Sequence, residues 1–134
     1  MDARLDIACE RWGLSDPRLI AETPRAQVYR VTQESQPAAL KLLTRVGVDS
    51  EAMAPAWLRH WRDHGAVRVR ATAPDALLLE WLPGPSLGDR ARAGDDSGAA
   101  KRLGRCAMHL HACRTEPDTI RATPLASHLN ALLD

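Results

Sequence analysis

The stretch "PAALKLL", residues 37–43, places a lysine in the middle of an apolar run. Alternation along a regular strand puts Leu40 and Leu42 on one face and Lys41 on the other. Lys41 is one of two lysines in a chain that otherwise uses arginine for its positive charge. Because an isolated buried ammonium is costly, this lysine must either reach solvent along its stem or pair with an anion.

Strand patterns continue on both sides of this stretch. Residues 19–32 alternate as two strands joined at Thr23 to Ala26, and residues 66–80 predict a second hairpin that turns at Pro74 and Asp75. With residues 38–43 as the third strand, the pattern predicts one antiparallel sheet of about five strands.

Helical patterns fill the rest of the chain. A helix capped by Asp49 or Ser50 and ended by Gly65 is expected between the two hairpins, with a kink or a fresh start at Pro55. Residues 86–96 are polar and linker-like. From about Ser97 the spacing of apolar residues predicts a helix with a stripe of Leu103, Ala107 and Leu110, and a last short helix is expected from Pro124, capped by Thr123.

Length and composition exclude several classes of protein. At 134 residues, with 45% hydrophobic and 26% charged residues, the chain fits one soluble α+β unit. A formal charge of +1 argues against a nucleic-acid partner. No apolar run reaches the roughly 18 residues of a membrane span, so we expect no membrane partner and a cytoplasmic location. Three cysteines without a pattern suit reduced thiols.

The partner expected for Lys41 is Glu51, ten residues later in the predicted helix. A strand lysine aimed by a helix glutamate, after a hairpin and before a buried strand that ends at Pro83 and Gly84, is how kinase-type folds hold a nucleotide. Arginine would suit such a narrow place less well than the compact lysine charge. The alternative is that Lys41 simply reaches solvent from an edge strand.

A series of motifs in order along the chain resembles the N-terminal half of the aminoglycoside and hydroxyurea resistance kinases, the streptomycin 6-kinase-like family. They are "RWGL", "AETPRAQVYRV", "PAALKLL", "EAMAPAWLRHWRDHGAVRV", "ALLLEWLPGPSL", "RAGDD", "LHAC" and "TPLASHLNAL". The resemblance implies a protein-kinase-like N-terminal lobe over residues 1–82, a hinge and linker over 83–96, and the helical start of an incomplete C-terminal lobe over 97–134.

The resemblance also implies a nucleotide site that uses ATP with magnesium. Lys41 would contact the phosphates and Glu51 would aim it. The hinge would bind the adenine edge through its backbone, an apolar back and roof would enclose the base, and the first hairpin tip would lie over the phosphates. The residues implied for these other roles are Glu80 and Leu82 at the hinge, Leu79 at the back, Val28 and Ala39 in the roof, and Thr23 and Arg25 in the tip.

One part of the kinase pattern is absent from the sequence. Transfer needs an aspartate base, an asparagine and a metal-binding aspartate, commonly in H-G-D-x-x-x-x-N and a later D-P or D-F-G. Gly94-Asp95-Asp96 lacks the histidine and the asparagine, and we interpret it as a helix cap. The family function would be ATP-dependent phosphotransfer to a hydroxyl of an aminoglycoside-like antibiotic, giving resistance. The chain alone is expected to be a catalytically incomplete nucleotide-binding lobe, with no catalytic and no metal-binding residue of its own.

Three alternatives stay open at this point. Cys106, His109 and Cys113 fall on one face of a predicted helix, where a soft metal could bind, although a fourth ligand is missing. The four tryptophans could stack on bases, against the near-neutral charge. The third alternative is that the protein is a nonenzymatic interaction module, which associates with itself through the exposed surface of the lobe.

Overall fold

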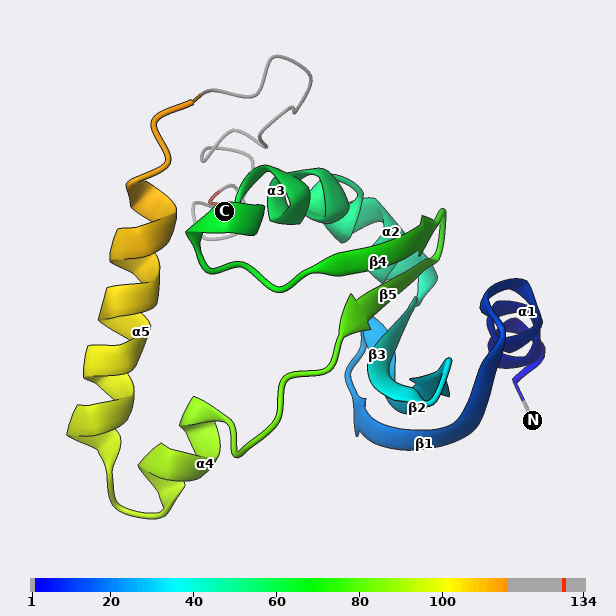
Figure 1. The fold of residues 1–134 in the computed structure, drawn as a ribbon, viewed down its shortest axis with the longest axis horizontal. Coiled ribbons are helices and arrows are strands. Elements are labelled where there is room, and N and C mark those ends of the chain that lie inside the picture. Colours follow the sequence, from blue (N-terminus) through cyan, green and yellow to red (C-terminus); the bar gives the residue numbers. More distant parts are fainter. Residues whose placement is uncertain (1, 116–128, 130–134) are drawn as a thin grey trace.

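The computed structural model describes residues 2–115 and residue 129. Its strands form one antiparallel sheet in the order β1-β2-β3-β5-β4 (Figure 1). The strands are β1 (Leu14–Glu22), β2 (Ala26–Gln33), β3 (Gln36–Leu43), β4 (Val69–Ala73) and β5 (Ala76–Glu80). The helices are α1 (Ala3–Trp12), α2 (Arg45–Glu51), α3 (Ala54–His60), the short 3-10 helix η1 (Arg62–His64), α4 (Leu87–Arg92) and α5 (Asp96–His111). The expected α+β class and five-stranded antiparallel sheet are confirmed.

Strand β3 lies at the centre of the sheet and separates two apolar clusters. Leu40 and Leu42 belong to the larger cluster, which α1 covers, and both are fully buried. Leu43 faces the other way, into a smaller cluster with Leu77 of β5 and, at its edge, Leu58 of α3. The pleat expected from "PAALKLL" is therefore the pleat observed, and it turns Lys41 toward the side of α2 and α3.

Helix α1 is not predicted from the sequence. The Asp2 side chain accepts a hydrogen bond from the Arg4 N–H at 3.0 Å and caps the helix start. Leu5 and Ala8 are buried against the sheet. The Arg4 guanidinium also donates to the Leu43 carbonyl at 2.7 Å, which joins the helix to the end of β3.

The helical segment after β3 begins earlier than predicted. Its cap is Thr44, whose Oγ1 accepts the Gly47 N–H at 3.2 Å, and not Asp49 or Ser50. The reason is that the chain turns directly at the end of β3, so that Thr44 is the first residue free to cap. The expected break is confirmed, because a second helix, α3, starts with Pro55 in its first turn. Gly65 ends the segment with φ of 91°, a left-handed conformation that favours glycine.

The segment 86–96, expected to be linker-like, contains helix α4. The Ser86 hydroxyl accepts the Asp89 N–H at 3.0 Å, and the Asp89 carboxylate accepts the Ser86 N–H at 3.3 Å. This reciprocal cap stabilises a helix in a stretch whose composition alone indicates a loop. The expected cap role in Gly94-Asp95-Asp96 is confirmed, since the Asp95 side chain accepts the Gly98 N–H at the start of α5.

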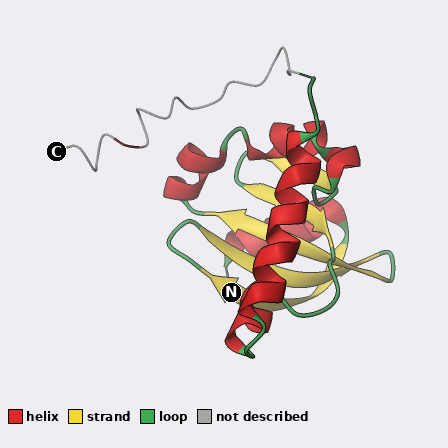
Figure 2. Cartoon of the chain, turned by 90° about the vertical axis from the view of Figure 1, so that its left-hand side faces the viewer, coloured by secondary structure: helices red, strands yellow, loops and turns green. Residues whose placement is uncertain are grey.

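Helices α4 and α5 pack against each other and lie beside the sheet, as the two ribbon views show (Figures 1 and 2). Of the predicted stripe on α5, Leu103 is 63% exposed, whereas Ala107 and Leu110 are partly buried. Met108 on the same helix is also exposed. The expectation of self-association stays a prediction. The short helix expected from Pro124 lies outside the described residues.

The ion pairs of Asp89 and Asp95 predict that part of the stability of this region is lost at acidic pH. The Arg92 guanidinium bonded to Asp89 at 2.6 Å lowers the pKa of that carboxyl, and Arg90 does the same for the pKa of Asp95. A carboxyl with a lowered folded pKa stabilises the fold above its unfolded pKa, and this contribution is lost as pH falls through the folded value. Carbon-detected NMR titration should show that Arg92→Gln raises the pKa of Asp89 and leaves that of Asp95 in place. Equal shifts of both carboxyls would contradict this pairing.

Candidate functional site

The connection between β1 and β2 forms a tight polar tip. The Thr23 Oγ1 accepts the N–H groups of Arg25 at 3.3 Å and Ala26 at 3.1 Å, and the Thr23 N–H donates to the Ala26 carbonyl at 2.9 Å. All three bonds involve Thr23, so this one residue fixes the conformation of the tip. The tip therefore holds its shape although it contains no glycine.

The same tip is fastened to the start of α2. The Thr44 N–H donates to the Arg25 carbonyl at 2.8 Å, and the Thr44 Oγ1 donates to the Pro24 carbonyl at 2.8 Å. Gly47 lies directly beneath, where a Cβ would overlap the Arg25 carbonyl oxygen and come within 3.0 Å of its carbonyl carbon. The sequence reading missed Thr44 and Gly47. Their signal in the sequence is a threonine that precedes a helix and a glycine three residues later.

Lys41 and Glu51 meet on the face of the sheet below this tip. The Lys41 Nζ donates to the Glu51 Oε2 at 2.5 Å, and the two side chains are 28% and 24% exposed. Strand register places Lys41 opposite Val28 of β2 and Leu77 of β5. Glu51 was expected near the start of its helix, and it is instead the last residue of α2, because that helix begins at Arg45.

These parts enclose a cavity of about 470 Å³ between the tip, β3 and α2. It is lined by Thr23, Pro24, Arg25, Ala26, Val28, Lys41 and Glu51. Two of its side chains carry positive charge and one carries negative charge, so the cavity has an excess of positive charge. An anion placed beside Lys41 would meet an ammonium already aimed by a carboxylate.

The remaining predicted residues do not line this cavity. Ala39 and Leu79 are register partners and share the sheet face of Lys41, although neither lines the cavity. The Glu80 N–H donates to the Arg68 carbonyl at 2.9 Å, and the Glu80 side chain accepts the Arg68 N–H at 2.9 Å. Leu82 follows β5, and its side chain is 62% exposed. The structure thus brings five predicted residues into one cavity, whereas Ala39, Leu79, Glu80 and Leu82 lie outside its lining.

The alternative metal ligands do not come together. In residues 2–115 and 129, no group of three or more histidine, cysteine or acidic side chains has the arrangement of a metal site. Cys106 is exposed, and Cys113 has its Sγ 3.4 Å from the Nε2 of His60 on α3. That contact joins the residues just after α5 to His60, which lies edge-on to Trp57; the Trp57 and Trp61 ring centroids are 4.9 Å apart.

The sheet order, the lysine–glutamate pair and the helices after the sheet define a kinase-like fold. A solved structure described as the streptomycin-ATP-APH(2")-IIa ternary complex is similar, with a TM-score of 0.59 over 88% of this chain and 42% of that chain, at 11% identity. At this identity the likeness concerns the fold.

The family follows from the sequence comparisons. The family described as aminoglycoside/hydroxyurea antibiotic resistance kinase matches residues 11–134, and the chain belongs to it. A relative, streptomycin 3''-kinase of Klebsiella pneumoniae, is 34% identical over 109 residues, which are 81% of this chain and 40% of the relative. The chain therefore spans about two fifths of the length of these proteins. In the part of the chain that the structure describes, the helices are too short or too polar to cross a membrane.

Proposed function

We propose that the Lys41 cavity binds the phosphates of ATP, and that the chain supplies the nucleotide side of phosphotransfer to a hydroxyl of an aminoglycoside-like antibiotic. The observation that carries the proposal is the 2.5 Å bond between Lys41 and Glu51 in a cavity covered by the Thr23 to Arg25 tip. Membership of the antibiotic resistance kinase family supports the reaction class. Resistance to such an antibiotic would be the biological outcome.

The residues that line the Lys41 cavity fit the phosphates of a nucleoside triphosphate. Lys41 offers three donors on a compact charge, and Glu51 holds that charge toward the cavity without filling it. Arg25 adds a second cation from the tip. Phosphoryl transfer depends mainly on positioning and electrostatic stabilisation of the reacting groups. These elements would contribute by holding the Lys41 charge and the tip in fixed positions around the phosphates.

The adenine ring would lie further along the same sheet face. Val28 and Ala39 would form its roof and Leu79 its back, since all three share the face of Lys41. Glu80 and Leu82 would bind the edge of the base through their backbone. The Glu80 N–H is already bonded to Arg68, so its carbonyl is the group of that residue proposed to accept a hydrogen bond from the base.

The described residues do not by themselves fit a magnesium site. Glu51 is the carboxylate that lines this cavity, and it is bonded to Lys41. Magnesium is usually held by one or two carboxylates together with the phosphates. The printed sequence also contains no H-G-D segment to supply a base. The proposal for these residues is therefore limited to binding and orienting the nucleotide, and no step of it runs through the metal.

Replacing Lys41 by methionine tests the proposal. Lys41→Met keeps the length of the side chain and removes its charge, so ATP should bind about tenfold or more weakly, while adenosine affinity should change little. Lys101→Met on α5 is the matched control, because it removes the chain's other lysine away from the cavity. Isothermal titration calorimetry with both ligands measures the difference.

Two results would count against the site. Equal loss of ATP and adenosine affinity in Lys41→Met would place the effect on the fold or the base pocket and not on the phosphates. Equal loss in Lys41→Met and Lys101→Met would show a general charge effect. Circular dichroism of the three proteins verifies that each is folded.

A further inference from the structure

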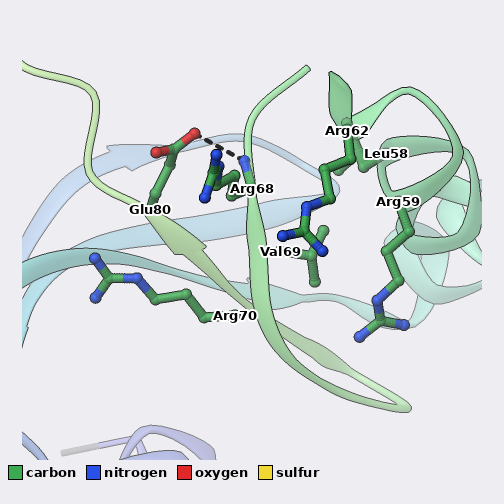
Figure 3. A pocket seen from close by; sticks show the side chains of 7 residues that line it. All are labelled: Leu58, Arg59, Arg62, Arg68, Val69, Arg70 and Glu80. Carbon is green, nitrogen blue, oxygen red and sulfur yellow. Dashed lines mark hydrogen bonds between the residues drawn. The ribbon is translucent and has the colours of Figure 1, made fainter. Parts of the chain in front are cut away.

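A second cavity lies between α3, η1 and the two hairpin strands β4 and β5. It has a volume of about 550 Å³ and is lined by Leu58, Arg59, Arg62, Arg68, Val69, Arg70 and Glu80 (Figure 3). None of these residues lines the Lys41 cavity. We propose that this cavity, called here the arginine cavity, binds a small molecule that carries two or more phosphate groups.

The charges of the arginine cavity are unbalanced. Four arginines and one acidic residue, Glu80, line it. The Oε1 of Glu80 accepts the backbone N–H of Arg68, and none of the four arginines forms an ion pair with another residue in the described part of the chain. Like charges held around one hollow repel each other, and a multiply charged anion removes that repulsion.

The arginines come from two stretches of the chain. Arg59 lies on α3 and Arg62 on η1, whereas Arg68 immediately precedes β4 and Arg70 lies within it. Figure 3 shows Arg62 extending toward β4 and Arg68 lying beside Glu80, with Arg59 and Arg70 directed to the two sides. Arg62 and Arg68 are therefore the central pair, and the other two arginines extend the positive field along the rim.

The chemistry of these groups selects the ligand. Guanidinium groups match phosphate oxygens with paired hydrogen bonds and stay charged at every physiological pH. The volume is within the range of small-molecule pockets, and Leu58 and Val69 give it an apolar wall. An amine-bearing sugar carries positive charge and would be repelled. This cavity is consequently unsuited to an aminoglycoside acceptor, and the proposal does not rest on the Lys41 site.

Inorganic pyrophosphate is the probe for this site, titrated into the chain by calorimetry without added metal. Arg62→Gln with Arg68→Gln should weaken its binding about tenfold or more, because two charge-assisted contacts are lost. Arg102→Gln with Arg105→Gln on α5 is the matched control and should change the affinity by about twofold or less, as expected for distant screened charges. Lys41→Met should leave most of the pyrophosphate affinity in place.

A third variant separates charge from geometry. Arg62→Lys with Arg68→Lys keeps both charges and loses the paired hydrogen bonds, so its affinity should lie between that of the glutamine variant and that of the unaltered chain. All the arginine variants change exposed side chains, so the fold should be retained, and circular dichroism verifies it.

Several outcomes would overturn the proposal. One is that the unaltered chain does not bind pyrophosphate, and another is that the α5 control variant weakens binding as much as the Arg62 and Arg68 variant does. The proposal also fails if the Arg62 and Arg68 variants bind pyrophosphate as the unaltered chain does, or if only Lys41→Met loses affinity. Citrate bound as tightly as pyrophosphate would assign the site to carboxylates and reject the phosphate ligand. Because the Lys41 and arginine variants are measured side by side, failure of either site is seen independently of the other.

Discussion

Gly47→Ala should lower the free energy of unfolding by about 1–3 kcal/mol, although alanine is the better helix former. The added Cβ would overlap the Arg25 carbonyl oxygen, which is backbone and cannot rotate away. Either α2 or the tip must move, and the hydrogen bonds that Thr44 makes to the tip would be stretched. Urea unfolding followed by circular dichroism measures the change.

Gly104→Ala is the matched control for this prediction. Gly104 lies inside α5, and a Cβ there would meet no atom within 4 Å. The same substitution should therefore stabilise by up to about 1 kcal/mol, the ordinary gain from alanine in a helix. Equal effects of the two substitutions would show that the tip is not held against α2. A loss of ATP affinity in Gly47→Ala, with none in Gly104→Ala, would connect the tip to the proposed phosphate site.

Leu40→Ala is the second large effect, with an expected cost of about 2–5 kcal/mol. Leu40 is 0% exposed and belongs with Leu42 and Leu78 to the larger cluster. Truncation removes apolar burial and leaves a cavity that the central strand cannot fill by moving, because β2 and β5 pair with it on both sides.

Two further variants allow the effect of truncating Leu40 to be measured even if Leu40→Ala does not fold. Leu40→Val removes less volume and should cost about 1 kcal/mol, which gives a folded protein if the alanine variant unfolds. Leu103→Ala makes the same truncation on α5, where the side chain is 63% exposed, and should change stability by about 0.5 kcal/mol or less. Similar midpoints in urea for Leu40→Ala and Leu103→Ala would contradict the placement of β3 at the centre of the core.

The features predicted from the sequence are those that depend on local patterns. Alternation in residues 37–43 is enough to separate the face of Lys41 from that of Leu40, because the strand period is two. Pro55 and Gly65 act through their own backbone restrictions, so the break and the end of the helical segment could be placed in advance.

The features that were missed depend on tertiary contacts or on weak caps. Helix α1 has a cap at Asp2 and a left-handed glycine, Gly13, at its end. Its apolar and polar residues alternate only weakly along the sequence, and the burial of Leu5 and Ala8 depends on their contact with the sheet. Helix α4 rests on two hydrogen bonds between Ser86 and Asp89. The arginine cavity joins residues of α3 and η1 to residues of the β4–β5 hairpin, and only the folded chain brings these segments side by side.

The hydrogen bonds between the tip and α2 also connect the tip to the Lys41–Glu51 pair. Thr44 bonds the tip to the first turn of α2, and Glu51 ends the same helix on Lys41. A displacement of the tip that keeps these bonds would carry α2 with it and change the position of Glu51 relative to Lys41. The position of the tip and the orientation of the lysine are thus coupled through one helix.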